Sequence, residues 1–72
     1  MKTEVNVVSI PVVEIKVSGA SKEEKLAELA RLKQKAVKFG HHIDTKDDPK
    51  TGEITALYYS ENAETLKILF TL

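Results

Sequence analysis

Apolar and polar positions alternate from Val5 to Val17, but the alternation changes phase after Val7 and again after Val12. Successive side chains of a strand point to opposite faces of a sheet. Each change of phase therefore needs one extra residue if the apolar side chains are to stay on one face. A β-bulge inserts such a residue, bends the strand and increases its twist. The pattern predicts one long first strand with two bulges, and with it a sharply curved sheet.

A hairpin is the alternative interpretation of the same segment. A break at Ser9-Ile10-Pro11 would give two short strands and a β-grasp-like ββαβββ order. Tight hairpin turns favour Gly, Asn and Asp, and this segment contains none of them. We therefore favour the bulged strand, in which Val8, Ile10 and Val12 share the core face with the apolar residues on either side.

The segment after this strand carries the signals of a helix. Ser21-Lys22-Glu23-Glu24 has the spacing of a capping box, in which the serine hydroxyl and the second glutamate bind backbone donors reciprocally. Good helix formers follow as far as Phe39, and acidic residues early and basic residues late complement the helix dipole. Gly40 stands where a left-handed C-terminal cap is expected. The sequence predicts a helix from about residue 22 to 39.

Three further strands are expected after the helix. Residues 41–46 and 53–60 form two of them, joined by the turn Asp47-Asp48-Pro49-Lys50-Thr51-Gly52, in which the glycine can adopt the positive φ of a bulge. Residues 65–72 alternate and predict the last strand. The expected fold is α+β in the order βαβββ, a single domain over residues 1–72 with one helix on a curved, mostly antiparallel four-stranded sheet.

The expected core joins the broad apolar side of the helix to one face of the last three strands. Its members on the helix are Leu26, Leu29, Ala30, Leu32, Ala36, Val37 and Phe39, and those on the sheet are Ile54, Ala56, Tyr58, Leu66, Ile68 and Phe70.

Composition narrows the function classes. Eleven basic and eleven acidic residues give no net field to attract nucleic acid or an anionic membrane. The absence of cysteine removes disulfides and thiolate metal sites. We expect neither a cofactor nor a signal peptide, and a cytoplasmic or recombinant soluble protein.

Lys33 is the one residue that could carry catalysis. It lies near the middle of the expected apolar side of the helix, beside Ala30 and Ala36. A cavity above these small residues would desolvate the amine, lower its pKa and make it a nucleophile or a base. In the structural alternative, the aliphatic stem lies along the edge of the core and the ammonium reaches water. We favour this alternative.

Other polar clusters are weaker candidates. His41 and His42 are adjacent, so on a strand they point to opposite faces and cannot both bind one metal ion. No metal is expected. Arg31, Lys35 and Lys38 could contact phosphates, but a solvated helix face explains them better.

The sheet face away from the helix carries a candidate interface. Leu57, Tyr59 and Leu69 are expected there among polar neighbours. Three exposed apolar side chains on neighbouring strands form a plausible contact for a homodimer or for a protein partner. Scattered surface hydrophobic residues are the alternative explanation.

The capping box Ser-Lys-Glu-Glu, the helix rich in Glu, Lys, Ala and Leu and the turn Asp-Asp-Pro-Lys-Thr-Gly-Glu all specify one fold. In this agreement the chain resembles de novo designed, idealised α+β proteins. The resemblance implies a stable scaffold without intrinsic catalysis, in which bulges curve the sheet. The alternative function is a small interaction or inhibitor domain that binds through a strand edge or through the face carrying Leu57, Tyr59 and Leu69.

Overall fold

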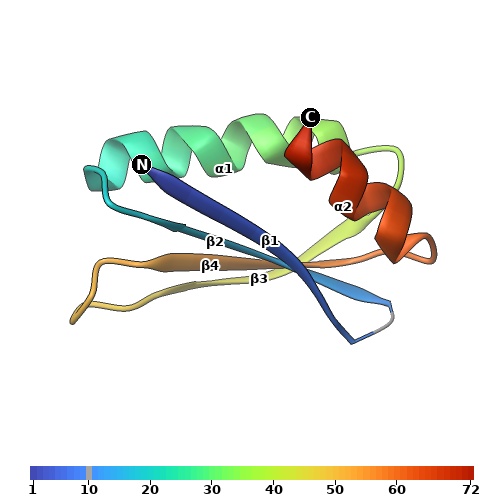
Figure 1. The fold of residues 1–72 in the computed structure, drawn as a ribbon, viewed down its shortest axis with the longest axis horizontal. Helices are drawn as coiled ribbons and strands as arrows, with labels where there is room; N and C mark the ends of the chain where they lie inside the picture. Colours follow the sequence, from blue (N-terminus) through green and yellow to red (C-terminus); the bar gives the residue numbers. More distant parts are fainter. Residues whose placement is uncertain (10) are drawn as a thin grey trace.

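The chain folds in the order ββαββα in the computed structural model, which describes residues 1–9 and 11–72 (Figure 1). The described elements are β1 (Lys2–Ser9), β2 (Val12–Ser18), α1 (Lys22–Ala36), β3 (His41–Asp47), β4 (Ile54–Tyr59) and α2 (Ala63–Thr71). The four strands form one antiparallel sheet in the order β1-β2-β4-β3. The α+β class and the curved, four-stranded open sheet are thus confirmed, whereas the order βαβββ is wrong.

The long first strand is the first correction. β1 and β2 pair antiparallel, with Val5 opposite Ile15 and Val7 opposite Val13, so the chain reverses between them. Pro11 lacks the N–H that a continuous strand would need there. The second change of phase, after Val12, therefore follows a reversal of the chain and not a bulge. The expected placement of Ile10 lies outside the described residues.

The first change of phase is a bulge. The register between β1 and β2 shifts by one residue between Val7 and Ser9, which leaves Val8 as the extra residue of β1. Val5 and Val7 pack against the core, while the side chain of Val8 is exposed. One of the two expected bulges is therefore confirmed, but the expected position of Val8 and Val12 on the core face is wrong.

The start of α1 follows its sequence signals, whereas its end does not. The Ser21 hydroxyl accepts a hydrogen bond from the Glu24 backbone N–H at 3.2 Å, and the Glu24 carboxylate completes the capping box. The helix ends at Ala36, three residues earlier than expected. The φ angle of Gly40 is not positive, so it is not a left-handed cap. Position 40 needs a glycine for a different reason, which is lack of room for a side chain. An added Cβ would lie 2.7 Å from the Tyr59 carbonyl oxygen.

The hairpin of β3 and β4 is confirmed. Gly52 has a φ of 74°, and its N–H donates to the Asp48 carbonyl at 2.7 Å. The register of this hairpin shifts by one residue between His42 and Asp44, which makes Ile43 an extra residue. Both outer strands of the sheet are therefore bulged.

The last expected strand, residues 65–72, is the helix α2. Ala63, Leu66 and Phe70 are buried along one side of it, whereas Ile68 is exposed. Leu66 and Phe70 are four residues apart, a spacing that fits both the helical repeat and the two-residue repeat of a strand. The buried Ala63, three residues before Leu66, fits the helix alone.

Both helices cover the same face of the sheet (Figure 1). α1 contacts β2, and α2 contacts β1, β2 and α1. The core joins one stripe of each helix to the inner side chains of the two central strands. Its fully buried members include Val13, Ile15, Val17, Leu32, Ile54 and Leu66. The side of the helix that the sequence predicted to be buried was too broad. Four of its members are exposed, namely Leu26, Ala30, Val37 and Phe39.

Truncation of single side chains in residues 63–71 distinguishes a helix from a strand. Leu66→Ala removes a fully buried side chain and is expected to lower the free energy of unfolding by about 2–5 kcal/mol. Ile68→Ala removes a side chain that is 59% exposed and is expected to change it by less than about 0.5 kcal/mol. Urea denaturation of both variants measures the difference. Equal losses would indicate the alternating strand.

Candidate functional site

Lys33 lines an open pocket between the end of α1 and β3. The pocket has a volume of about 300 Å³, and its walls include Ala36, Val37, His42 and Tyr58. Ala36 is buried, whereas Lys33 itself is exposed at the rim. The structure thus brings Lys33 and Ala36 together, as expected, but Ala30 is not among the residues that line the pocket.

Of the polar side chains that line this helix-strand pocket, His42 has local partners. The ring of His42 lies against Tyr58 with 5.3 Å between centroids, and His42 Nε2 is 2.6 Å from Thr45 Oγ1. Burial raises the pKa of the Tyr58 hydroxyl, which keeps it protonated at neutral pH. Reactivity of Lys33 remains the less favoured interpretation, because the side chain is exposed and not enclosed in a cavity.

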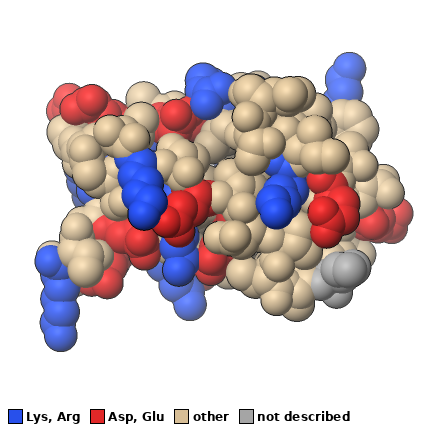
Figure 2. Space-filling model, in the orientation of Figure 1, with Lys and Arg blue, Asp and Glu red and all other residues tan. Residues whose placement is uncertain are grey.

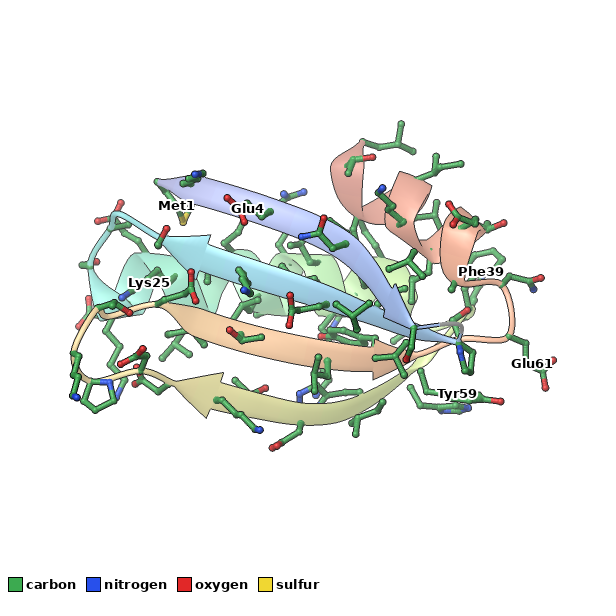
Figure 3. The ribbon with its side chains drawn as sticks, turned by 60° about the horizontal axis from the view of Figure 1, so that its bottom comes forward. Met1, Glu4, Lys25, Phe39, Tyr59 and Glu61 are labelled. Carbon is green, nitrogen blue, oxygen red and sulfur yellow. The ribbon has the colours of Figure 1, made fainter. Side chains whose placement is uncertain are left out.

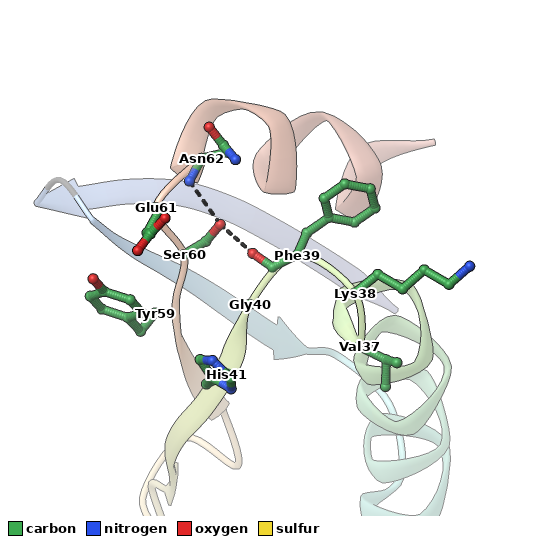
Figure 4. A pocket seen from close by; sticks show the side chains of 9 residues that line it. All are labelled: Val37, Lys38, Phe39, Gly40, His41, Tyr59, Ser60, Glu61 and Asn62. Atoms are coloured by element: carbon green, nitrogen blue, oxygen red, sulfur yellow. Dashed lines mark hydrogen bonds between the residues drawn. The ribbon is translucent and has the colours of Figure 1, made fainter.

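A second pocket, of about 330 Å³, lies where the loop after α1 passes the loop after β4 (Figure 4). Ser60 is buried between the two loops. Its hydroxyl donates to the Phe39 carbonyl and accepts from the Asn62 N–H at 3.1 Å. Gly40 lies close to the Tyr59 carbonyl at the same place, where the two loops cross. Ser60 thus links the loop between α1 and β3 to the loop between β4 and α2.

Lys25, which the sequence did not single out, is the buried lysine of α1. It is 6% exposed, and its Nζ donates to the Gly52 carbonyl at the opposite end of the sheet from Tyr59 (Figure 3). The signal was present in the spacing of Lys25, Leu29, Leu32 and Ala36, which follows one helical stripe. The actual inner side of α1 is centred on that stripe, which leaves Lys33 outside.

The expected interface is only partly assembled. Leu57 and Tyr59 lie on the sheet face away from the helices, and Tyr59 is 40% exposed. Leu69 does not join them, because it belongs to α2 on the opposite face. Val12, which pairs with Tyr59 across the sheet, takes its place. We call Val12, Leu57 and Tyr59 the outer patch.

Charged side chains on the surface lie mostly beside opposite charges (Figure 2). Arg31 Nε donates to Glu28 at 2.6 Å, and Lys35 Nζ donates to the Leu72 carbonyl at 2.8 Å. Two of the three basic residues considered for phosphate binding are therefore engaged locally.

The start of β1 also carries a local ion pair. Lys2 Nζ lies 2.9 Å from Glu4 Oε1. The hydrogen bond and then the charge of the partner raise the pKa of Lys2 and lower the pKa of Glu4. Both side chains are solvated, so the pair stabilises the fold little.

Two negative findings concern residues 1–9 and 11–72. This part of the chain contains no cluster of three His, Cys, Asp or Glu side chains that could hold a metal ion. Neither of its helices has both the length and the apolar character that a membrane span requires.

Comparisons with protein-family models, with curated proteins and with solved structures gave no match.

Loss of the Lys25 hydrogen bond is expected to cost stability. Lys25→Met keeps most of the aliphatic stem but leaves the Gly52 carbonyl without this donor, so the free energy of unfolding should fall by about 1–3 kcal/mol. Lys22→Met is the control, because the Lys22 side chain is exposed and its Nζ comes no closer than 3.7 Å to the carboxylate of its partner Asp47. This substitution should lower the free energy of unfolding by less than about 0.5 kcal/mol. Equal effects in chemical denaturation would show that the Lys25 bond is unimportant.

Proposed function

We propose that this chain is a non-catalytic scaffold of the de novo designed, idealised kind. The observation that carries the proposal is the use of its buried polar side chains. Lys25 and Ser60 each donate to the backbone carbonyl of a loop from another part of the fold. Within residues 1–9 and 11–72, each buried side-chain nitrogen or oxygen has a hydrogen-bond partner. Such groups hold elements together and are not poised for chemistry.

The junctions between elements support the same proposal. The capping box starts α1, and Gly19 and Gly52 supply positive φ angles in the two turns that need them. Each device is local and agrees with the tertiary fold, as idealised proteins require.

The sheet edges also suit a scaffold. β1 carries an extra residue at Val8 and β3 one at Ile43. Bulges and charged side chains on an outer strand hinder pairing with another chain. They favour a stable sheet over binding through a strand edge.

Imine trapping tests the absence of catalysis at Lys33. The chain is incubated with pyruvate and sodium borohydride, and labelling is quantified by peptide mass spectrometry. Lys33 should be labelled no faster than the exposed Lys38, because both amines are solvated. Selective labelling of Lys33 that is lost in Lys33→Arg would overturn the proposal in favour of an amine catalyst.

Protein interaction through the outer patch is the second candidate function. It is favoured by the register, which places Val12 beside Tyr59 on the face that neither helix covers. The sequence alone would have placed Leu69 there. Val12 and Tyr59 make one end of this face apolar, and charged side chains follow further along the strands. This asymmetry would fix the orientation of a bound partner.

Tyr59→Glu tests the patch. It should leave the free energy of unfolding within about 1 kcal/mol, since Tyr59 is a surface residue, and abolish association of the chain as measured by light scattering. Ile68→Glu places the same charge on an exposed apolar position of α2 and should leave association unchanged. Equal association of both variants would remove the patch as a binding surface.

A further inference from the structure

The outer face of the sheet carries two rows of opposite charge. The registers of the four strands place Asn6, Glu14, Leu57 and Asp44 side by side. Two residues further along the strands they place Glu4, Lys16, Thr55 and Lys46 side by side. The two rows are about 7 Å apart, from the rise of a strand. The first row carries two acidic residues, and the second carries two basic residues together with Glu4, which is paired with Lys2.

This arrangement is complementary to itself. Consider a two-fold axis that runs between the rows, parallel to them and just outside the face. Rotation about that axis places Glu14 of one copy over Lys16 of the other, and Asp44 over Lys46. Leu57 then faces Thr55, and Asn6 faces Glu4. Each contact occurs twice, as in an isologous dimer, and the two sheets pack as layers about 10 Å apart.

We propose that a second copy of this chain docks on the outer face through these two rows. The inference rests on the second candidate function, binding through the outer patch, and names its partner. A partner of strong opposite charge is disfavoured, because the three acidic and two basic side chains of the rows give a net charge of only −1. The existing pair of Lys16 and Glu14, at 3.7 Å within one copy, becomes part of a four-charge network.

The size of the contact sets its strength. Four strands spaced about 4.8 Å apart give a face about 19 Å wide, and strands of six to eight residues make it about 20–26 Å long. Its area of about 400–500 Å² is smaller than the roughly 800 Å² per partner of a standard interface. The dimer is therefore weak and concentration-dependent. Because its charges are near the surface, it weakens with added salt.

A charge exchange in β3 tests the pairing. Asp44→Lys makes both β3 positions basic, and Lys46→Asp makes both acidic. Both side chains are exposed, so each variant should fold. In each homodimer like charges then meet twice, and the dissociation constant should rise about tenfold or more. An equimolar mixture restores opposite charges at both contacts, so its dissociation constant should return to within about threefold of the original.

The measurement is sedimentation equilibrium from about 10 µM to about 1 mM protein at low and high salt. The control mixture is Glu64→Lys with Lys38→Asp, which has the same net charges but places the changes on the helix side. It should show no gain over its two components. A gain in the control equal to that in the test mixture would overturn the proposal, because net charge alone would explain it.

Two other outcomes separate this inference from the second candidate function. In the first outcome, the chain associates and Tyr59→Glu abolishes the association, but the mixture of Asp44→Lys and Lys46→Asp does not regain the original dissociation constant. The two-row pairing is then wrong, and binding through the outer patch stands. If the chain is monomeric at about 1 mM and low salt, the dimer is wrong and the scaffold function is unaffected.

Discussion

The structure depends on covering one wide face of a four-stranded sheet. Strands lie about 4.8 Å apart and a helix with its side chains is about 10 Å wide, so one helix covers only about half of such a face. α2 supplies the second cover, with Leu66 and Phe70 against the sheet. Contact of Phe70 with Tyr58, at 5.2 Å between ring centroids, brings α2 toward the middle of the sheet. A fifth strand would have widened the face and left it open.

The placement of the helices also explains where the pockets lie. Both helices contact β2, whereas β3 is exposed along its whole length. The space beside β3 remains open and forms the pocket that Lys33 lines. Lys25 and Ser60 then fix the two ends of the layer by binding the Gly52 and Phe39 carbonyls. These two buried polar side chains thus act on the packing of the helices against the sheet.

Three local signals in the sequence predicted the structure correctly. The capping box at Ser21, the turn with Gly52 and the extra residue near Val8 all appear as expected. Patterns that fit two structures were misread. Leu66 and Phe70 suit a helix and a strand alike, and the turn at Pro11 lacks the usual turn residues. In the candidate sites, alternation along β4 correctly paired Leu57 with Tyr59 but could not exclude Leu69.

The sequence by itself determined the α+β class, the start of α1, the β3–β4 hairpin and one bulge, because each depends on backbone preferences within a few residues. Only the tertiary structure decided that α2 is a helix, that Lys25 and not Lys33 is buried, and that Val12 lies beside Tyr59. These depend on the area of sheet that must be covered, on the rotation of α1 and on strand register. All three are set by contacts between residues far apart in the chain, whereas the local patterns fit more than one arrangement.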